Sequence, residues 1–486
     1  MFFNSLDFAI FLPIVFILYW FATKKNLRLQ NILLLVASYF FYACWDYRFL
    51  FLLIFSTLLD YYTGLKMQDA KTEEKKRFWF WLSIGVNLGF LALFKYYNFF
   101  IDSLTHSFSL LGFKANFWTL QVILPVGISF YTFHGLSYVI DIYKSRIKPE
   151  RNFIDYSVFV SFFPLLVAGP IERATHLLPQ IKAERSFDKN KAIDGLRQIL
   201  WGLFKKVVIA NNCATFANTI FNNSDKYNGS TLILGAVFFA FQIYCDFSGY
   251  SDIAIGTARL FGIDLLRNFA FPYFSRDIAE FWRRWHISLS TWFRDYLYIP
   301  LGGSKGSTWI KVRNTFIIFI VSGFWHGANW TFIIWGFLNA LYIMPSILFK
   351  TNRNNLDIVA QGKYLPTLKQ IFSMILTFGL TVFAWIFFRA ESVGHAWMYI
   401  RKIFSSSTFH LPQGSAFLGE GMTIYIMGGF LLFFFSFEWI GREHKYAISN
   451  IGIGWPRIAR WTLYYGIIFA IFFFHGKAKQ FIYFQF

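Results

Sequence analysis

TFIIFIVSGFWHGANWTFIIWGFLNALYIM, residues 315–344, is the apolar run that decides the fold. It contains no Lys, Arg, Asp or Glu, yet His326 lies in its middle third. As one helix the run would extend about 45 Å, well beyond the roughly 30 Å hydrocarbon core of a bilayer. It is therefore predicted to tilt strongly or to break, and the break is expected at Gly323, Gly327 and Asn329. His326 then lies deep in the protein, where an ionisable side chain indicates function by default.

The composition is typical of a membrane protein. Of 486 residues, 56% are hydrophobic and 15% are charged, whereas soluble proteins have roughly 25% charged residues. We predict an all-α polytopic membrane protein, one domain over residues 1–486, with about ten to twelve membrane elements, some of them re-entrant or interfacial. The predicted elements lie near residues 7–23, 31–45, 48–64, 78–100, 117–140, 154–169, 199–221, 231–262, 315–344, 368–388, 422–440 and 460–475.

Basic residues predict the orientation of the chain. The segment before Lys24 lacks a basic region and a small-residue cleavage site, so a first span is expected there and not a removable signal peptide. Basic clusters follow it at Lys24, Lys25 and Arg28, and recur at 66–77 and 144–151. The positive-inside rule places these clusters in the cytoplasm and the N-terminus on the outer side of the membrane.

The net charge of +20 fits the positive-inside rule and attraction to anionic lipid, with a polyanionic substrate as the alternative. No soluble basic domain is evident, so no nucleic-acid partner is expected. Cys44, Cys213 and Cys245 show no CxxC spacing and are expected to be packing residues. Zinc-ligand spacings such as HExxH are absent from the sequence, so no metal site is expected.

Residues 275–301, SRDIAEFWRRWHISLSTWFRDYLYIPL, are strongly amphipathic. Apolar residues recur there at steps of three and four, which predicts a helix that lies in the membrane interface or dips partway into the bilayer. His286 is expected to border its apolar stripe. Pro300 and the loop LGGSKG (301–306) are expected to end the helix. The loop lacks the spacing of a P-loop.

Taken together, these segments resemble the membrane-bound O-acyltransferase family. The most specific matches are FWRRWHISLSTWFRDYLYIPLGG (281–303) and SGFWHGANWTFIIWGFLNAL (322–341). Further matches are PVGISFYTFHGLSYVIDIYK (125–144), FFPLLVAGPIER (162–173), FQIYCDFSGYSDIAIG (241–256) and FIYFQF (481–486). The chain is most similar to the bacterial branch that includes the alginate O-acetylation protein, and more distantly to the teichoic-acid D-alanyl transferase. His134 and Leu165 stand where glutamine is commoner.

The resemblance implies transfer of an acyl group, usually acetyl, from a cytoplasmic thioester such as acetyl-CoA to an acceptor on the outer side of the bacterial inner membrane. It also implies a central tunnel through the protein and no permanently bound cofactor. It implies that His326 is the essential catalytic residue and that His286 is the second residue near the reaction centre. The chemistry agrees, because an alcohol needs a base to become a nucleophile and imidazole is suited to that task near neutrality. A buried imidazole is expected to be uncharged and able to accept a proton. The structural alternatives are a His326 that bonds across helices and a His286 that binds a headgroup.

Other candidate site residues follow from the same segments. Lys305, Arg283 and Arg284 are candidates for the donor phosphates. The candidate tunnel residues are Trp325, Asn329, Trp285, Ser290, Asp246 and Asp252. Both aspartates lie in an apolar run and need partners, for which Arg276, Arg283 and Arg294 are candidates, and a purely structural network is the alternative. His134 is interpreted as a packing or pathway residue.

The sequence leaves the identity of the acceptor molecule open. It is expected to be an exopolysaccharide, a cell-wall glycan, or a serine on an extracytoplasmic SGNH-type partner that relays the acyl group. D-alanyl transfer to teichoic acid is the alternative within the family. A polysaccharide transporter or flippase and a non-catalytic scaffold are alternatives outside it, although the inverted repeats of many transporters are not evident.

Overall fold

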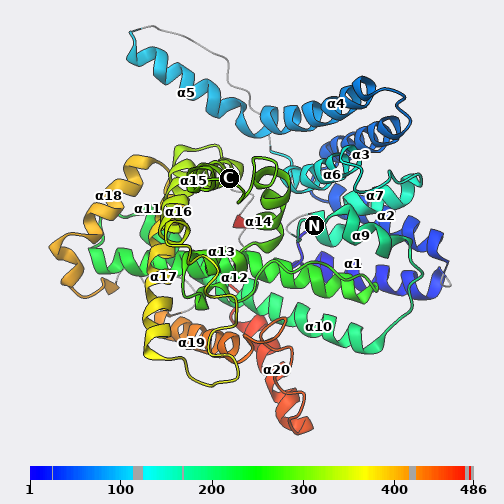
Figure 1. Ribbon diagram of the computed structural model, residues 1–486. Coiled ribbons are helices and arrows are strands. Elements are labelled where there is room, and N and C mark those ends of the chain that lie inside the picture. The colour runs from blue at the N-terminus through cyan, green and yellow to red at the C-terminus, as the bar shows by residue number, and fades with distance from the viewer. Residues whose placement is uncertain (24–25, 113–123, 167–168, 415–422, 477–480, 483–486) are drawn as a thin grey trace. The chain divides into compact units, whose positions relative to one another are not determined.

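The computed structural model describes residues 1–486 except 24–25, 113–123, 167–168, 415–422, 477–480 and 483–486. Parts of several expected features therefore lie outside the described residues. They are the cluster at Lys24 and Lys25, the elements at 117–140, 154–169 and 422–440, and the FFPLLVAGPIER and FIYFQF motifs. Every element in the described part is helical (Figure 1). The chain forms two compact units, Met1–Gly195 with Thr257–Leu266, and Leu196–Gly256 with Arg267–Phe486. The single catalytic domain over 1–486 stays a prediction.

The first unit is organised around α6, most of whose residues are buried. Its elements are α1 (Leu6–Ile17), η1 (Leu18–Ala22), α2 (Leu27–Ala43), α3 (Tyr47–Gln68), α4 (Glu73–Leu91), η2 (Ala92–Tyr96), α5 (Tyr97–Leu110), α6 (Ile128–Tyr143), α7 (Phe153–Ser161), α8 (Phe163–Leu166) and α9 (Ala174–Lys182). Helices α10 (Lys189–Leu203) and α12 (Gly229–Leu260) contribute residues to both units.

Polar contacts lock α3, α4 and α6 together. The carboxylate of Asp60 on α3 accepts hydrogen bonds from Ser83 Oγ (2.6 Å) and Asn87 Nδ2 (2.7 Å) on α4. A Cβ at Gly135 of α6 would lie 1.9 Å from Asp60 Oδ2. The glycine is therefore required for the close approach of α3 to α6.

His134 has a structural contact within the same unit. Its Nε2 accepts a hydrogen bond from the backbone N–H of Glu172 (3.1 Å), and its side chain is buried. Glu172 in turn accepts from the N–H of Leu266 (2.6 Å) and contacts His176 Nδ1 (2.7 Å). The histidine thus joins two motifs, which supports the packing interpretation.

The second unit contains both motif histidines. Its elements are η3 (Phe204–Ala210), α11 (Asn211–Asn222), most of α12, η4 (Pro272–Phe274), α13 (Ile278–Arg284), α14 (Ile287–Phe293), η5 (Arg294–Tyr298), α15 (Thr308–His326), α16 (Trp330–Leu348), α17 (Leu368–Arg389), α18 (Val393–Ile403), η6 (Ser406–Phe409), α19 (Ile424–Ile440) and α20 (Arg457–Phe473).

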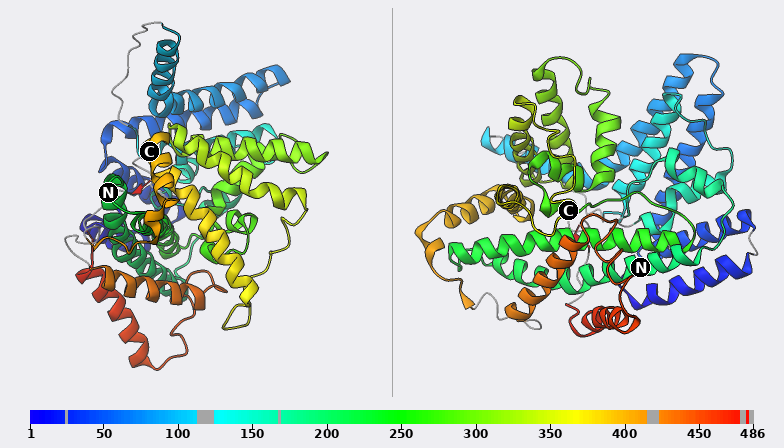
Figure 2. Two further views of the ribbon diagram at one scale, coloured as in Figure 1. Left: turned by 90° about the vertical axis from the view of Figure 1, so that its left-hand side faces the viewer. Right: turned by 60° about the horizontal axis from the view of Figure 1, so that its bottom comes forward.

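The predicted break in 315–344 is confirmed at Gly327 and Asn329, whereas Gly323 lies inside α15 and does not interrupt it. Helix α15 ends at His326 and α16 begins at Trp330, and the two lie side by side as a hairpin (Figures 1 and 2). The break falls at residues 327–329, between helices of 19 residues each. Each helix is short enough to fit within a bilayer without the extreme tilt that a single helix would need.

The single amphipathic helix predicted for 275–301 is wrong. The chain forms α13, a sharp turn at Trp285 and His286, then α14 and η5. His286 has φ of 42°, a left-handed conformation that side-chain-bearing residues rarely adopt. Helical periodicity did not reveal this break, because Phe281, Trp285 and Leu289 continue the apolar pattern across it and are all buried.

Five helical stretches in the described residues are long and apolar enough to cross a membrane. They are Tyr47–Gln68, Glu73–Leu110, Gly229–Leu260, Trp330–Leu348 and Leu368–Arg389. Three shorter apolar stretches are Leu6–Ala22, Leu27–Ala43 and Ile424–Ile440. The protein is thus a multi-pass, all-helical membrane protein, while the count of ten to twelve membrane elements stays a prediction.

Candidate active site

His326 ends α15 at the tip of the hairpin, and its side chain is 3% exposed. The ring of Phe332 lies directly over Gly327, where a Cβ would be 2.1 Å from Phe332 Cε2. Asn329 is the N-cap of α16. Its Oδ1 accepts from the N–H of Thr331, and its Nδ2 donates to the carbonyl of Glu391 (both 3.0 Å). The side-chain amide of Asn329 thus caps α16. That Asn329 lines a substrate tunnel stays a prediction.

Two glycines bring the hairpin helices into backbone contact. A Cβ at Gly323 of α15 would lie 2.2 Å from the carbonyl oxygen of Phe332, and a Cβ at Gly336 of α16 would lie 2.2 Å from that of Phe319. Small residues at a helix interface allow this approach within a bilayer. Because the contact is made by backbone atoms, it holds the end of α15 and thereby His326 in one position.

An aromatic cage from three helices surrounds His326. Ring centroids of Trp325, Trp335 and Phe388 lie 4.9, 5.1 and 5.3 Å from the imidazole. Trp385 stacks on Trp335 at 5.6 Å. Of these residues only Trp325 was predicted, because Trp335, Trp385 and Phe388 are indistinguishable in sequence from ordinary core residues. The cage excludes water, which strengthens electrostatic interactions at the histidine.

Trp325 contacts both histidine rings. The His286 ring lies 6.2 Å from Trp325, edge-on to Phe247 at 4.6 Å, and is 1% exposed. Within the described part of the chain, neither ring nitrogen of His286 has a hydrogen-bond partner. A buried, unsatisfied polar group is costly, so the ring is either strained or awaits a ligand.

Asn268 anchors the strained turn that carries His286. Its backbone carbonyl accepts from the N–H of Ile287 (2.9 Å), and its Oδ1 accepts from Ser288 Oγ (2.6 Å). Its Nδ2 donates to Ser251 Oγ on α12 (2.9 Å). All of these polar side chains are buried. Asn268 therefore connects the left-handed turn to the long helix, although the sequence offered no motif that pointed to it.

A cavity of about 610 Å³ lies beside the same segment. Five cationic residues line it, namely Arg283, Arg294, Lys311, Lys350 and Arg353. Ser290, Tyr298 and Ser304 add hydroxyls, and no acidic residue is among the described lining residues. The cavity is therefore suited to a polyanion such as a phosphate-bearing ligand.

Trp282 connects this cavity to the histidine cage. It lines the cavity, and its ring lies 5.7 Å from Trp335, which contacts His326. Its indole N–H is buried and has no hydrogen-bond partner among the described residues. The rings of Trp282 and Trp335 therefore link the wall of the cavity to His326.

The predicted donor residues are only partly brought together. Arg283 lines the cavity, although it also donates to the carbonyls of Asn352 and Asn355 (both 2.8 Å). Arg284 is bonded to Glu280 and to the carbonyl of Asp357. Lys305 is exposed and is not among the lining residues. Of the predicted tunnel residues, Ser290 lines the cavity, whereas Trp285 is buried against Trp385 at 5.1 Å.

The aspartates of the apolar run pair with lysines, not with the predicted arginines. Asp246 contacts Lys206 Nζ (2.5 Å) and Asp252 contacts Lys205 Nζ (2.6 Å). Arg276 instead binds Glu280 and Asp357 (both 3.0 Å). Both lysines lie on η3, 40 positions before Asp246 and 47 positions before Asp252, so no local sequence spacing predicted the pairs. The contacts favour the structural network.

Among the described residues, no group of three or more His, Cys, Asp or Glu side chains could hold a metal ion.

The model of the membrane-bound O-acyltransferase family matches residues 144–388. A Pseudomonas putida protein named "Probable alginate O-acetylase AlgI" is 38% identical over 466 residues, 92% of each chain. A Helicobacter pylori peptidoglycan O-acetyltransferase is 37% identical over 79% of this chain and 76% of its own. A Bacillus subtilis teichoic acid D-alanyltransferase is 28% identical over 56% of this chain and 70% of its own.

Proposed function

The chain belongs to the membrane-bound O-acyltransferase family, and from that premise we propose that it moves acetyl groups from acetyl-CoA across the membrane to hydroxyls of an extracellular or cell-wall polysaccharide. It is a multi-pass membrane enzyme, an O-acyltransferase. The observation that carries the proposal is the position of His326, buried at a break between two apolar helices and bounded by aromatic rings. Acetyl is preferred to D-alanyl because the relatives named for O-acetylation match more of the chain at higher identity.

In the proposed mechanism His326 is the general base. Its imidazole takes the proton of the acceptor hydroxyl as the hydroxyl oxygen attacks the thioester carbonyl. A carbon–oxygen bond forms, the carbon–sulfur bond breaks, and the proton passes from the imidazole to the leaving thiolate. Donor and acceptor approach from opposite faces, which explains why the base lies at depth.

His286 is proposed to orient the acyl carbonyl. Its neutral ring carries one N–H, and neither nitrogen has a hydrogen-bond partner among the described residues. A buried donor fixed in place stabilises the negative charge that develops on a carbonyl oxygen under attack. The left-handed turn and the anchor at Asn268 hold the ring before substrate binds, so little reorganisation is needed.

Asn268→Ala is expected to lower kcat by about tenfold to a hundredfold, because small displacements of a catalytic group have effects of that size. Steady-state kinetics should show a loss in kcat with little change in KM for the donor. Ser288→Ala removes only one of the bonds to Asn268 and should have a smaller effect. If Asn268→Ala lowered the melting temperature but left kcat intact, the anchor would be structural only.

The basic cavity is proposed to hold the phosphates of the donor. Five arginine and lysine side chains from residues 283–353 line this cavity. Trp282 connects the cavity to the cage around His326. The cavity includes Ser304 of the LGGSKG loop but not Lys305, and it includes Arg283, which the sequence analysis proposed for the donor phosphates. Arginine and lysine are the usual partners of phosphate groups.

Lys311→Gln and Arg353→Gln are each expected to raise KM for acetyl-CoA by about threefold to tenfold, with kcat unchanged, since each removes one partly exposed phosphate contact. The increase should shrink at high ionic strength. Lys305→Gln is the matched comparison, because Lys305 does not line the cavity. An equal rise in KM for Lys305→Gln would indicate that the donor phosphates bind at the LGGSKG loop and not in the basic cavity.

The immediate acceptor is tested by reconstitution. Supplying labelled acetyl-CoA to membranes containing the protein and following the label into polysaccharide tests donor and acceptor class together.

We further propose that an extracytoplasmic SGNH-type partner relays the acetyl group and that the N-terminus faces outside. Label that reaches a partner's serine before the polymer supports the relay, and label that reaches the polymer without any partner refutes it. Labelling with D-alanine in place of acetyl would refute the proposed donor.

A further inference from the structure

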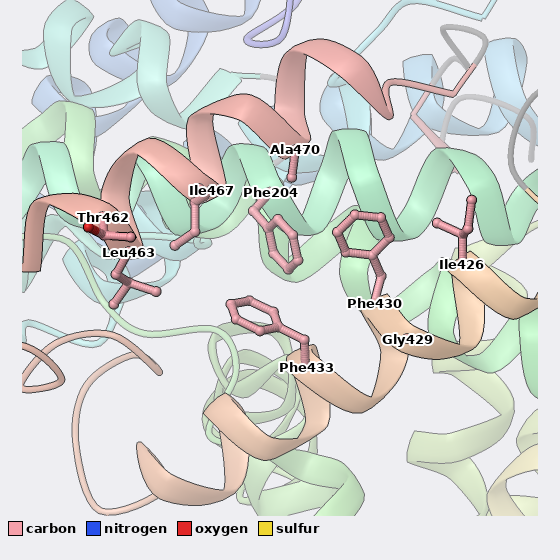
Figure 3. A pocket seen from close by; sticks show the side chains of 10 residues that line it. Phe204, Ile426, Gly429, Phe430, Phe433, Thr462, Leu463, Ile467 and Ala470 are labelled. Carbon is pink, nitrogen blue, oxygen red and sulfur yellow. The ribbon is translucent and has the colours of Figure 1, made fainter. Parts of the chain in front are cut away.

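An apolar and a basic cavity of the second unit differ in what they can recognise. The cavity between α19 and α20 has an almost wholly apolar lining (Figure 3). The basic cavity is lined in part by the segment 350–357, KTNRNNLD, which follows α16 and which we call the strap. Lys350, Asn352 and Arg353 are its lining residues. The position of the strap therefore decides how many positive charges meet an anionic ligand.

Electrostatic repulsion opposes this position of the strap. Lys350 and Arg353 share the cavity with Arg283, Arg294 and Lys311, and no acidic residue is among the described lining residues. Like charges that share a cavity repel one another, and a protein screens them less than water does. Contacts outside the cavity must therefore hold the strap in place.

Two arginines beside Glu280 of α13 hold the far end of the strap. Arg276 and Arg284 both donate to the backbone carbonyl of Asp357 (2.9 Å each). Arg276 also forms an ion pair with the Asp357 carboxylate (3.0 Å). Both arginines are paired with Glu280, whose side chain is 1% exposed. A buried carboxylate thus fixes the two guanidinium groups that grip the strap.

A contact between two side chains completes this set of bonds, which we call the clamp. Asn355 Nδ2 donates to Asp277 Oδ2 (2.5 Å). The other oxygen of Asp277 caps α13, because it accepts the N–H of Glu280 (2.7 Å). Neither Asn355 nor Asp357 is among the described residues that line the cavity. The clamp can therefore be altered without removing a side chain that faces the ligand.

We propose that the clamp holds Lys350 and Arg353 in the basic cavity against their repulsion and thereby sets the affinity of the protein for the phosphates of coenzyme A. This inference rests on the donor site proposed above. Asn355 and Asp277 are positioning residues, because they act on the ligand through the strap. Loss of the clamp should weaken donor binding and leave kcat unchanged, since neither motif histidine belongs to the strap or to the clamp.

Exchange of the two side chains at the Asn355–Asp277 contact tests this role. Asn355→Asp places a second carboxylate beside Asp277 and should release the strap by repulsion. Asp277→Asn in the same chain restores one donor and one acceptor at the contact, and asparagine caps a helix about as well as aspartate. The exchange variant, which carries both substitutions, should therefore behave like the wild type.

Binding of coenzyme A is measured by calorimetry on the full-length protein in nanodiscs, together with kcat and KM for acetyl-CoA. Asn355→Asp should raise Kd and KM by about threefold to tenfold, as expected for the loss of a partly exposed phosphate contact. Its kcat should not change. Trypsin should cleave after Arg353 faster in this variant, and the exchange variant should return Kd and the cleavage rate to the wild-type values.

Double variants show whether the clamp acts through the cations of the strap. In the Arg353→Gln background Asn355→Asp should raise Kd by a smaller factor, because one of the charges that it displaces is already missing. With Lys311→Gln, on α15, the two effects should come closer to adding. An unchanged Kd in Asn355→Asp, or no recovery in the exchange variant, would overturn the proposal. An unchanged Kd in both Arg353→Gln and Lys311→Gln would refute the donor site itself, and the role of the clamp with it.

Discussion

Replacement of His326 by alanine is expected to lower acyl transfer by about 10²- to 10⁴-fold, the usual effect of removing a general base. The imidazole ends α15 inside the cage of Trp325, Trp335 and Phe388. The variant should still insert in the membrane and fold, because the hairpin is held by backbone contact at Gly323 and Gly336. Transfer of labelled acetyl groups by purified, reconstituted protein measures the effect.

His134→Gln is the control for this experiment. His134 is also a buried histidine, and its Nε2 accepts the backbone N–H of Glu172. The amide oxygen of glutamine can accept the same bond, so this variant should keep most of its activity. Near-normal transfer by a correctly folded His326→Ala variant would show that another group acts as the base.

The hairpin was predictable from the length of the apolar run and from the residue types at its middle. A run of apolar residues too long for the bilayer has to break where glycine and an N-capping asparagine stand, and α15 ends at His326 just before them. Position along the chain also predicted that His326 would be buried. The neighbours of the ring were not predictable, because Trp335 and Phe388 belong to helices whose faces become known only after packing.

The region around His286 shows where sequence patterns fail. The apolar period continues through a left-handed residue at 286, because both sides of the break pack into one core. Similarly, the basic cavity collects cations from 283 to 353 that lack any common spacing. The anchor at Asn268 acts through three long-range hydrogen bonds. Such features depend on tertiary geometry and leave no periodic signal.

The ion pair between Lys206 and Asp246 is the most deeply buried of those around α12. The two side chains are 1% and 4% exposed. The second carboxylate oxygen of Asp246 accepts the backbone N–H of Ile482 (2.9 Å). Phe481 beside it packs on Phe247, which in turn lies against His286. The pair therefore attaches the segment at 481–482 to the core that supports the second histidine.

Lys206→Met is expected to destabilise the protein by about 3–5 kcal/mol, because it leaves a buried carboxylate without its counterion. The double variant Lys206→Met/Asp246→Asn should recover most of this loss, since asparagine carries no charge and still accepts the bond from Ile482. Thermal unfolding in detergent, over all four members of the cycle, measures the coupling. Arg48→Met, which breaks the exposed pair with Asp46, should change nothing measurable. Equal losses for the single and double variants would mean that the side-chain packing of Lys206, and not its charge, stabilises the core.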